Sequence, residues 1–229
     1  FSLRNCQARE TAQLTALHVD NNLNIAECKM GLNATEQNPQ VMLGNTRIGG
    51  RFKAVVIGVH LKSKAPHGAR SRQEAMKISI ANRRKQLAQA IWLRRRIEEH
   101  LKVGEPLIVL GDLNDGPGLD EYEDLFGRSS VEIVMGEKSQ MQLYDPHAQM
   151  ALHQRIGAQP STARFYIPAR KRFLQALLDY IFVSDDLRGG EWRIWHPHDD
   201  AECLAMPELC EALITASDHF PVTLDIDLP

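Results

Sequence analysis

The chain has 229 residues, of which 43% are hydrophobic and 24% are charged, as in an ordinary globular protein. Its net charge of -2 argues against a protein that coats nucleic acid, and its four cysteines are too sparse for a disulfide scaffold. No apolar run approaches the roughly 18 residues of a membrane span. We expect a single domain over residues 1–229, reduced and cytoplasmic, whose first residues are a processed end or the middle of a longer chain.

The charge is unevenly distributed along the chain. Residues 70–102 contain ten basic and three acidic residues, and residues 201–229 contain no Lys or Arg. One interpretation is a solvated helix face and an acidic tail. The other is a basic rim beside an acidic floor that attracts metal ions.

The first half of the chain predicts a hairpin, a long helix and a buried strand. Residues 9–18 favour a helix with Ala12, Leu14 and Leu17 on one side. Residues 41–45 and 53–59 flank Gly49-Gly50 and predict a hairpin. Residues 72–102 predict a long helix with one apolar stripe, formed by Leu87, Ala90, Leu93, Ile97 and Leu101.

Gly104 and Pro106 end this helix, and the aliphatic run at residues 106–110 predicts an interior strand covered on both faces. A strand, a helix and a strand in this order indicate a layered α/β unit. Asp112 and Asn114 follow the buried run, and strand alternation would place both on the same side of its end.

In the second half, residues 120–126 favour a short helix and residues 131–135 a short strand. Residues 139–176 show little periodicity. Residues 178–183 and 222–228 alternate as strands. Residues 189–203 read as loop-rich, and their two tryptophans, Trp192 and Trp195, are expected to pack against the sheet.

Four predicted strand ends carry related polar groups. They are His60, Asp112 with Asn114, Asp179, and Asp218 with His219. Carboxylates hold hard divalent cations, a His with a carboxylate partner serves as a base or a donor, and neutral donors meet charge that develops on phosphate oxygens. Together these groups suit metal-assisted hydrolysis of a phosphoester.

The order of four short motifs resembles the endonuclease/exonuclease/phosphatase superfamily. The motifs are His60-Leu61-Lys62-Ser63, Gly111-Asp112-Leu113-Asn114, Leu178-Asp179-Tyr180-Ile181 and Ser217-Asp218-His219-Phe220-Pro221-Val222. The resemblance covers residues 41–229. It implies an α/β fold, a four-layer α/β sandwich with two packed, mostly antiparallel sheets flanked by helices.

The resemblance also implies roles for the matching residues. His219 would be the catalytic His at the scissile phosphate, and Asp179 would hydrogen-bond it and fix its orientation. Asp112 would position or deprotonate the attacking water. Asn114 would stabilise the transition state, and His60 would donate a hydrogen bond to a phosphate oxygen.

The implied metal ligands are Asp218, Asp112 and Asn114, with Mg²⁺ or Mn²⁺ as the cofactor. Family members also use an early strand that ends in Asn and a second that ends in a metal-binding Glu. Asn5 and Glu27 are the candidates here, but the interval from Glu27 to His60 is too short for the usual intervening strands. We therefore expect the missing strands and the main metal Glu to lie upstream of Phe1.

The expected substrate is DNA, contacted by Lys62, Ser63 and Arg164, so the expected function is that of a metal-dependent nuclease. Two alternatives remain open. One is a phosphomonoesterase acting on a phospholipid or sugar phosphate, and the other is a non-catalytic fragment that binds nucleic acid or a partner. The segment His196-Pro197-His198-Asp199-Asp200 contains zinc-ligand residue types, but a solvated loop is the simpler interpretation because no matching ligand set lies elsewhere.

Overall fold

The computed structural model describes residues 2–5, 11–16, 42–48, 52–117, 125–137, 141–153, 159–167 and 171–227, with side chains from residue 54 onward. Its strands are β1 (Ser2–Asn5), β2 (Thr11–Ala16), β3 (Met42–Ile48), β4 (Phe52–His60), β5 (Leu107–Asp112), β6 (Ala163–Ile167), β7 (Arg172–Ala176), β8 (Asp179–Val183), β9 (Glu191–Ile194) and β10 (Val222–Asp227). Its helices are α1 (Arg72–Lys102), α2 (Ser130–Met135), α3 (Pro146–His153), α4 (Ala201–Ala205) and α5 (Pro207–Ala216), with a 3-10 turn at Asp185–Leu187.

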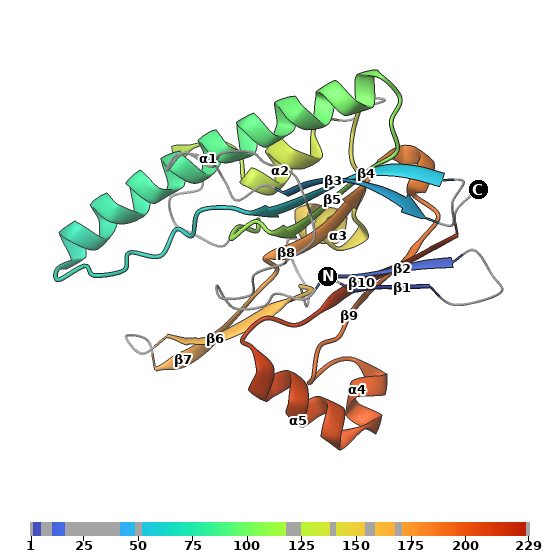
Figure 1. Cartoon of the computed structure of the whole chain (residues 1–229). Helices are drawn as coiled ribbons and strands as arrows, with labels where there is room; N and C mark the ends of the chain where they lie inside the picture. The colour runs from blue at the N-terminus through green and yellow to red at the C-terminus, as the bar shows by residue number, and fades with distance from the viewer. Residues whose placement is uncertain are drawn as a thin grey trace.

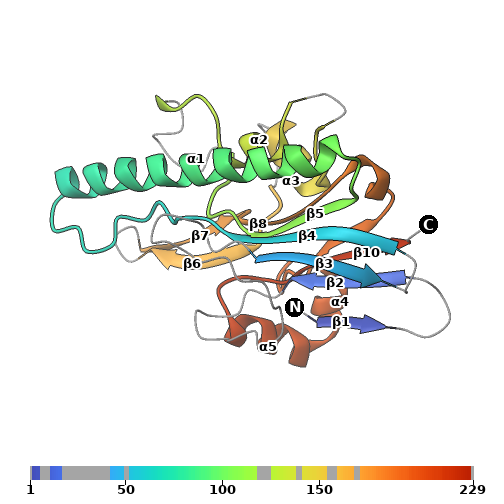
Figure 2. The same cartoon turned by 45° about the horizontal axis from the view of Figure 1, so that its top comes forward.

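Two four-stranded sheets form the centre of the molecule. One has the order β1-β2-β10-β9 and the other β3-β4-β5-β8, and β6 pairs with β7 in a separate hairpin. All pairs are antiparallel except β4 with β5. Helices α1 and α2 cover the outer side of the second sheet, and α4 and α5 lie outside the first (Figure 1, Figure 2). The predicted four-layer α/β arrangement, with its mostly antiparallel sheets, is confirmed.

Strand β5 is buried on both faces, as its unbroken aliphatic run predicts. Leu107 and Val109 pack in the cluster that includes the buried side of α1, whereas Ile108 and Leu110 pack in the cluster shared with β10. All four residues are at most 1% exposed. Since alternate residues of a strand face opposite sides, an interior strand needs apolar residues at every position.

Helix α1 has the predicted bounds. Ser71 caps its start, where the hydroxyl accepts the Glu74 N–H at 3.1 Å. The buried face differs from the predicted stripe, because Leu87 and Leu101 are only half-buried while the polar Arg83 and Gln86 are fully buried. These two side chains point inward because they contact the turn at residues 113–115, as described below.

Three predictions of local structure were wrong. Residues 11–16 form strand β2 rather than a helix, and pair with both β1 and β10. Pairing with two neighbouring strands outweighs the weak helical pattern of such a short segment. Residues 130–135 form helix α2 rather than a strand, because Ser129 and Glu132 make a reciprocal capping box that starts a helix.

The third error concerns segments read as irregular. Residues 139–176 contain α3, β6 and β7, residues 189–203 contain β9, and α4 and α5 were not predicted at all. The predicted hairpin at residues 41–59 is confirmed by the β3–β4 pairing. The predicted helix at residues 120–126 lies mostly outside the described residues, and the expectation of further strands upstream of Phe1 stays a prediction.

Candidate active site

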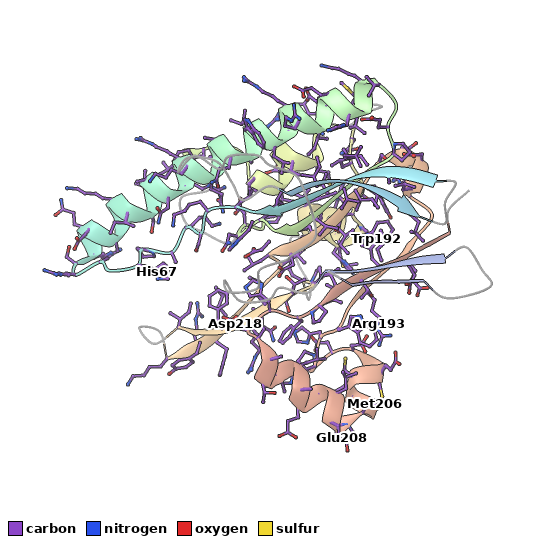
Figure 3. The ribbon with its side chains drawn as sticks, viewed as in Figure 1. His67, Trp192, Arg193, Met206, Glu208 and Asp218 are labelled. Carbon is purple, nitrogen blue, oxygen red and sulfur yellow. The ribbon has the colours of Figure 1, made fainter. Side chains whose placement is uncertain are left out.

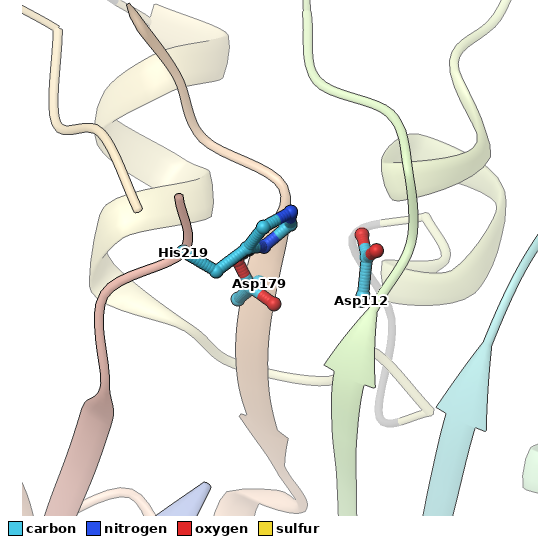
Figure 4. Close-up of side chains that lie close together, drawn as sticks. All are labelled: Asp112, Asp179 and His219. Atoms are coloured by element: carbon cyan, nitrogen blue, oxygen red, sulfur yellow. Dashed lines mark hydrogen bonds and ion pairs between the residues drawn. The ribbon is translucent and has the colours of Figure 1, made fainter. Parts of the chain in front are cut away.

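The register of three neighbouring strands brings the predicted polar residues together. His60 at the end of β4 pairs with Asp112 at the end of β5, and Asp112 pairs with Asp179 at the start of β8. His219 precedes β10 in the other sheet and is held by an isolated bridge to Ala163. One ligand atom from each of Asp112, Asp179 and His219 lies within 4.8 Å of the others, and the three side chains meet at the strand ends (Figure 4).

His219 and Asp179 form a directly hydrogen-bonded pair. The imidazole Nδ1 lies 2.8 Å from Asp179 Oδ2. The hydroxyl of the buried Thr162 donates to the same carboxylate oxygen at 2.8 Å. Thr162 Oγ1 in turn accepts the Leu178 and Asp179 N–H groups, each at 3.0 Å. Asp179 is therefore fixed from both sides, and it fixes the orientation of the imidazole ring.

Asp112 and Asn114 contact each other, but not for the predicted reason. Strand β5 ends at Asp112, and Asn114 adopts a left-handed backbone conformation with φ 51°. This turn directs the Asn114 N–H to Asp112 Oδ1 at 2.7 Å and its side-chain amide to Asp112 Oδ2 at 2.8 Å. Gln86 holds the turn from below, where its amide donates to the carbonyls of Leu113 and Asn114 at 3.1 and 2.9 Å.

The three side chains perturb one another's protonation. Burial raises the pKa of the Asp112 carboxyl, and the Asp179 charge raises it further, to about 7, although the His219 charge opposes the shift. Burial disfavours the charged form of His219, but the hydrogen bond to Asp179 and the charges of Asp179 and Asp112 outweigh it and raise the pKa to about 9. At neutral pH His219 is thus a cation beside two carboxyl groups.

Comparison with known proteins places this geometry in a family. A family model described as the Endonuclease/Exonuclease/phosphatase family matches residues 48–219. The chain belongs to the Endonuclease/Exonuclease/phosphatase family. Members of this family are metal-dependent phosphoric ester hydrolases.

Solved structures with a similar arrangement share little sequence with the chain. TDP2 from Caenorhabditis elegans is 17% identical with a TM-score of 0.46, and the match covers 83% of this chain and 45% of that one. The human Nocturnin catalytic domain with bound sulfate is 18% identical with a TM-score of 0.36, covering 81% and 51%. The mannosyl-6-phosphatase Bt3783 of Bacteroides thetaiotaomicron is 15% identical with a TM-score of 0.42, covering 81% and 56%. The chain thus spans about half of each solved chain, and no curated protein sequence matches it.

The residues of the family site suit a divalent cation. Two carboxylates and an imidazole converge within 4.8 Å, which is the only such group among the described residues. Hard cations favour carboxylate oxygens, and a positive charge here would relieve the repulsion between Asp112 and Asp179 that raises the Asp112 pKa. The two carboxylates therefore fit a divalent cation, whereas His219, itself a cation at neutral pH, lies beside that ion and is not a ligand to it.

Asp115, to which the sequence assigned no role, anchors the family's Asp112–Asn114 loop. Its fully buried carboxylate contacts Lys64 at 2.5 Å and Arg83 at 2.7 Å. It also accepts the Ser130 N–H and hydroxyl at 2.7 and 2.6 Å. Burial alone would raise its pKa, but the charges of Lys64 and Arg83 lower it below the usual value. Asp115 thereby ties the loop to α1, α2 and the segment that follows His60.

Thr162 was also missed. A lone threonine in a stretch without periodicity carries no sequence signal for a role beside Asp179. Asp115 did offer a signal, because it directly follows Asn114. Both residues were visible in the sequence, but their partners lie 15 to 51 residues away along the chain.

The other predicted site residues surround the central group rather than join it. His60 Nε2 lies 3.5 Å from Asp112 Oδ2 and its side chain is 40% exposed. Asp218 is exposed and lies beside the β6–β7 hairpin, where its carbonyl accepts the Arg164 N–H at 2.8 Å (Figure 3). The guanidinium of Arg164 lies 3.9 Å from the centre of the Phe173 ring.

Lys62 and Ser63 lie in the segment after β4, where Lys62 is exposed and Ser63 is half-buried. The Lys62 N–H donates to the Gln89 side chain at 2.8 Å, which leads this segment along α1. Glu27 lies outside the described residues.

The His196–Asp200 segment is neither a ligand cluster nor simply a solvated loop. His196 is buried and pairs with Asp199 at 3.1 Å, while Asp200 caps α4 and pairs with Arg193. The prediction that the tryptophans pack on the sheet is confirmed by their hydrogen bonds. Trp192 donates to the Ile181 carbonyl, and Trp195 donates to Thr223.

Proposed function

We propose that this protein is a divalent-metal-dependent phosphodiesterase that hydrolyses nucleic acid, with DNA as its substrate. The observation that carries the proposal is the convergence of Asp112, Asp179 and His219 within 4.8 Å in a member of a phosphoesterase family. Asp179 orients His219, and the pKa of His219 differs from that of Asp112. Two neighbouring groups with different pKa values can take the acid and base roles in one reaction.

In the proposed reaction, His219 binds the scissile phosphate. Its raised pKa keeps the imidazole protonated at neutral pH, so it donates a hydrogen bond to a phosphate oxygen and stabilises the charge that grows there. Asp179 accepts a hydrogen bond from the Nδ1–H group and prevents the ring from rotating. Thr162 holds Asp179 in place during this step.

Asp112 orients the attacking water and accepts its proton as the water oxygen bonds to phosphorus. The bond from phosphorus to the sugar oxygen breaks, and that oxygen leaves and takes a proton from solvent. Burial and the Asp179 charge raise the pKa of Asp112 to about 7 in the metal-free site, and a bound cation would lower it, so that Asp112 meets the water as an ionised carboxylate. Asn114 keeps the Asp112 carboxylate in one orientation through its two hydrogen bonds and lies where it can meet the transition state. His60, 3.5 Å from Asp112, is the further donor for a phosphate oxygen.

A divalent cation would be held by Asp112 together with Asn114 and Asp218, with Mg²⁺ or Mn²⁺ as the proposed ion. When bound, it supplies Lewis-acid polarisation of the phosphate and charge neutralisation beside the carboxylates.

DNA as the substrate class is supported by the groups around the site. Lys62 is exposed on the segment that follows His60, Ser63 lies beside it, and Arg164 lies on the β6–β7 hairpin next to Asp218. Cationic and hydroxyl side chains of this kind contact a phosphate backbone without reading its bases. Among the described residues, no helix has the length and apolar character required to cross a bilayer. The cytoplasmic location stays a prediction.

Incubation of the purified protein with supercoiled plasmid and Mg²⁺ or Mn²⁺ tests the proposal. Nicking should require the metal, stop on addition of EDTA, and be lost in His219→Ala. His153→Ala is the matched control, since His153 is exposed and, among the residues that the structure describes, its ring hydrogen-bonds only within its own helix, so nicking should persist. Turnover of p-nitrophenyl phosphate without plasmid nicking would instead identify a phosphomonoesterase, and turnover of neither would identify a non-catalytic binding protein.

A further inference from the structure

The outward face of α1 carries basic residues that the proposed active site does not use. Between Glu74 and Glu98 the helix contains seven basic residues and no acidic one. Solvated helices usually interleave charges of both signs, because oppositely charged residues three or four apart attract and like charges repel. The basic side chains of this stretch therefore repel one another, which charges of alternating sign would avoid.

Apart from Lys85, the basic residues between Glu74 and Glu98 divide into two groups. Arg83, Arg94 and Arg96 each have a carboxylate partner, at 2.7, 3.0 and 2.6 Å. Lys77, Arg84 and Arg95 are exposed, and none of them forms an ion pair with any residue that the structure describes. We call these three residues the cationic ridge.

The ridge is straight. Its members are separated by seven and eleven residues, so at 100° per residue they lie within about 20° of one another on one face of the helix. At 1.5 Å per residue the ridge is about 27 Å long, which approaches one turn of a DNA duplex, about 34 Å. The exposed Lys85 flanks it. The opposite face of α1, with the buried Ala90, Leu93 and Ile97, packs onto the sheet.

The ridge lies on the far side of α1 from the active site. Gln86, on the buried face, donates to the Leu113 and Asn114 carbonyls, and Arg84 lies two residues before it on the outward face. The first turns of α1, which contain Lys77, project beyond the ends of the central strands, on the same side as the β6–β7 hairpin (Figure 1, Figure 2). A polymer bound at the site would reach the ridge by passing around these turns, so only a polymer longer than the site contacts it.

We infer that the cationic ridge is a second contact surface for the phosphate backbone of a nucleic acid, remote from the scissile bond. This inference rests on the proposed function, because it takes the nucleic acid that binds the ridge to be the substrate of the proposed enzyme. Phosphate contacts by Lys and Arg add affinity that is independent of sequence and decreases with salt. The ridge binds long substrates in this way and leaves short ones unaffected.

An anionic membrane is the other polyanionic surface that a basic helix meets. A helix that lies in a membrane interface inserts an apolar face beside its cationic one. The apolar face of α1 is already buried against the sheet, and the large apolar side chains that α1 exposes, Met76 at 41% and Ile91 at 48%, lie 15 residues apart and do not form a second apolar face. The ridge therefore fits a nucleic-acid backbone better than a bilayer.

The test compares two triple variants that remove the same charge. Lys77→Gln, Arg84→Gln and Arg95→Gln together neutralise the ridge. Arg96→Gln, Arg128→Gln and Arg188→Gln together neutralise three basic side chains that have carboxylate partners in the structure. Binding in EDTA is measured by fluorescence anisotropy with a duplex of about 40 base pairs and a strand of about 8 nucleotides, at salt concentrations from about 50 to 200 mM.

The ridge variant should bind the long duplex about 10-fold or more weakly at low salt, and its log–log salt slope should fall by up to about 3, since each lost phosphate contact removes about 0.9. Its binding of the short strand should be unchanged, and the control variant should bind both DNAs like the wild type. Equal losses in the two variants, or no loss in the ridge variant, would overturn the inference. Ridge-dependent binding to phosphatidylserine vesicles in place of the duplex would overturn it as well.

Hydrolysis of bis(p-nitrophenyl) phosphate in the presence of Mg²⁺ or Mn²⁺ separates this inference from the proposed function. This small diester does not reach the ridge, so all three proteins should hydrolyse it equally. If the wild type does not turn it over, the proposed activity fails, and the duplex-binding measurement still decides whether the ridge contacts nucleic acid. Thermal melting of each variant checks that the substitutions, all at the surface, leave the fold intact.

Discussion

Replacing Asp112 by Asn should stabilise the fold while abolishing catalysis. The Asp112 carboxyl is 4% exposed, and burial together with the Asp179 charge raises its pKa from 3.8 to about 7. The native state therefore disfavours the ionised form that the unfolded chain adopts freely at neutral pH. Asn keeps the shape of the side chain and removes the charge, so the native state loses this unfavourable term.

The size of the effect follows from the pKa shift and the hydrogen bonds. A rise of about 3 pH units corresponds to about 4 kcal/mol at 1.36 kcal/mol per unit. In Asp112→Asn the new side-chain amide can accept only one of the two hydrogen bonds that Asn114 now donates, which costs about 1–2 kcal/mol. The net gain is about 2–3 kcal/mol, or a rise in Tm of about 5–10 °C for a chain of this length.

The gain depends on pH in a defined direction. The unfolded carboxyl loses its proton near pH 4 and the folded one near pH 7, so the wild type loses stability as the pH rises through this window. Above about pH 7 the loss is complete and constant. The variant should therefore melt slightly below the wild type at about pH 4, where only the hydrogen-bond cost remains, and should have its full advantage at about pH 8.

Thermal unfolding followed by circular dichroism in EDTA at both pH values measures this difference. Asp185→Asn is the control, because its side chain is 80% exposed, and it should leave Tm nearly unchanged. Added Mg²⁺ should raise Tm of the wild type, since a ligand that binds only the native state stabilises it, and should have little effect on the variant. If Asp112→Asn melts below the wild type at pH 8 in EDTA, the Asp112 carboxylate is not under electrostatic strain and the reasoning fails.

Three further substitutions test the supports of the site. Thr162→Val keeps the shape but removes the hydroxyl that holds Asp179, and should lower kcat about 10-fold or more with KM little changed and cost about 1–3 kcal/mol in urea unfolding. Arg83→Met leaves the buried Asp115 carboxylate short of a partner and should cost about 3 kcal/mol or more in the same measurement. Gly111→Ala should abolish soluble folded protein in expression trials, because a Cβ there would lie 2.0 Å from the Val59 carbonyl oxygen and the backbone has φ +133°.

Each of these variants has a control of the same chemistry at an exposed position. Thr215→Val, Arg188→Met and Gly189→Ala should behave like the wild type, since the first two side chains are exposed and an added Cβ at Gly189 meets nothing within 4 Å. Unchanged kcat in Thr162→Val would show that Asp179 does not depend on its hydroxyl. Wild-type stability in Arg83→Met, or normal expression of Gly111→Ala, would contradict the packing described for these two positions.

The sequence by itself determined the parts of the protein that depend on neighbouring residues. The unbroken aliphatic run of β5 and the apolar spacing of α1 each contain their own signal, so both elements were predicted with the right type and nearly the right bounds. The order of the four motifs also indicated the family and the identities of Asp112, Asp179 and His219. The capping pair of Ser129 and Glu132 held an equally local signal for α2 that was not used.

Only the tertiary structure decided what depends on groups distant along the chain. Residues 11–16 became a strand because β10, about 200 residues further on, supplies its hydrogen bonds. Thr162 and Asp115 acquired their roles from partners in other elements, and the left-handed turn at Asn114, rather than strand alternation, directs its amide to Asp112. The pKa values of Asp112 and His219 likewise arise from burial and from charges on separate strands, which no local pattern encodes.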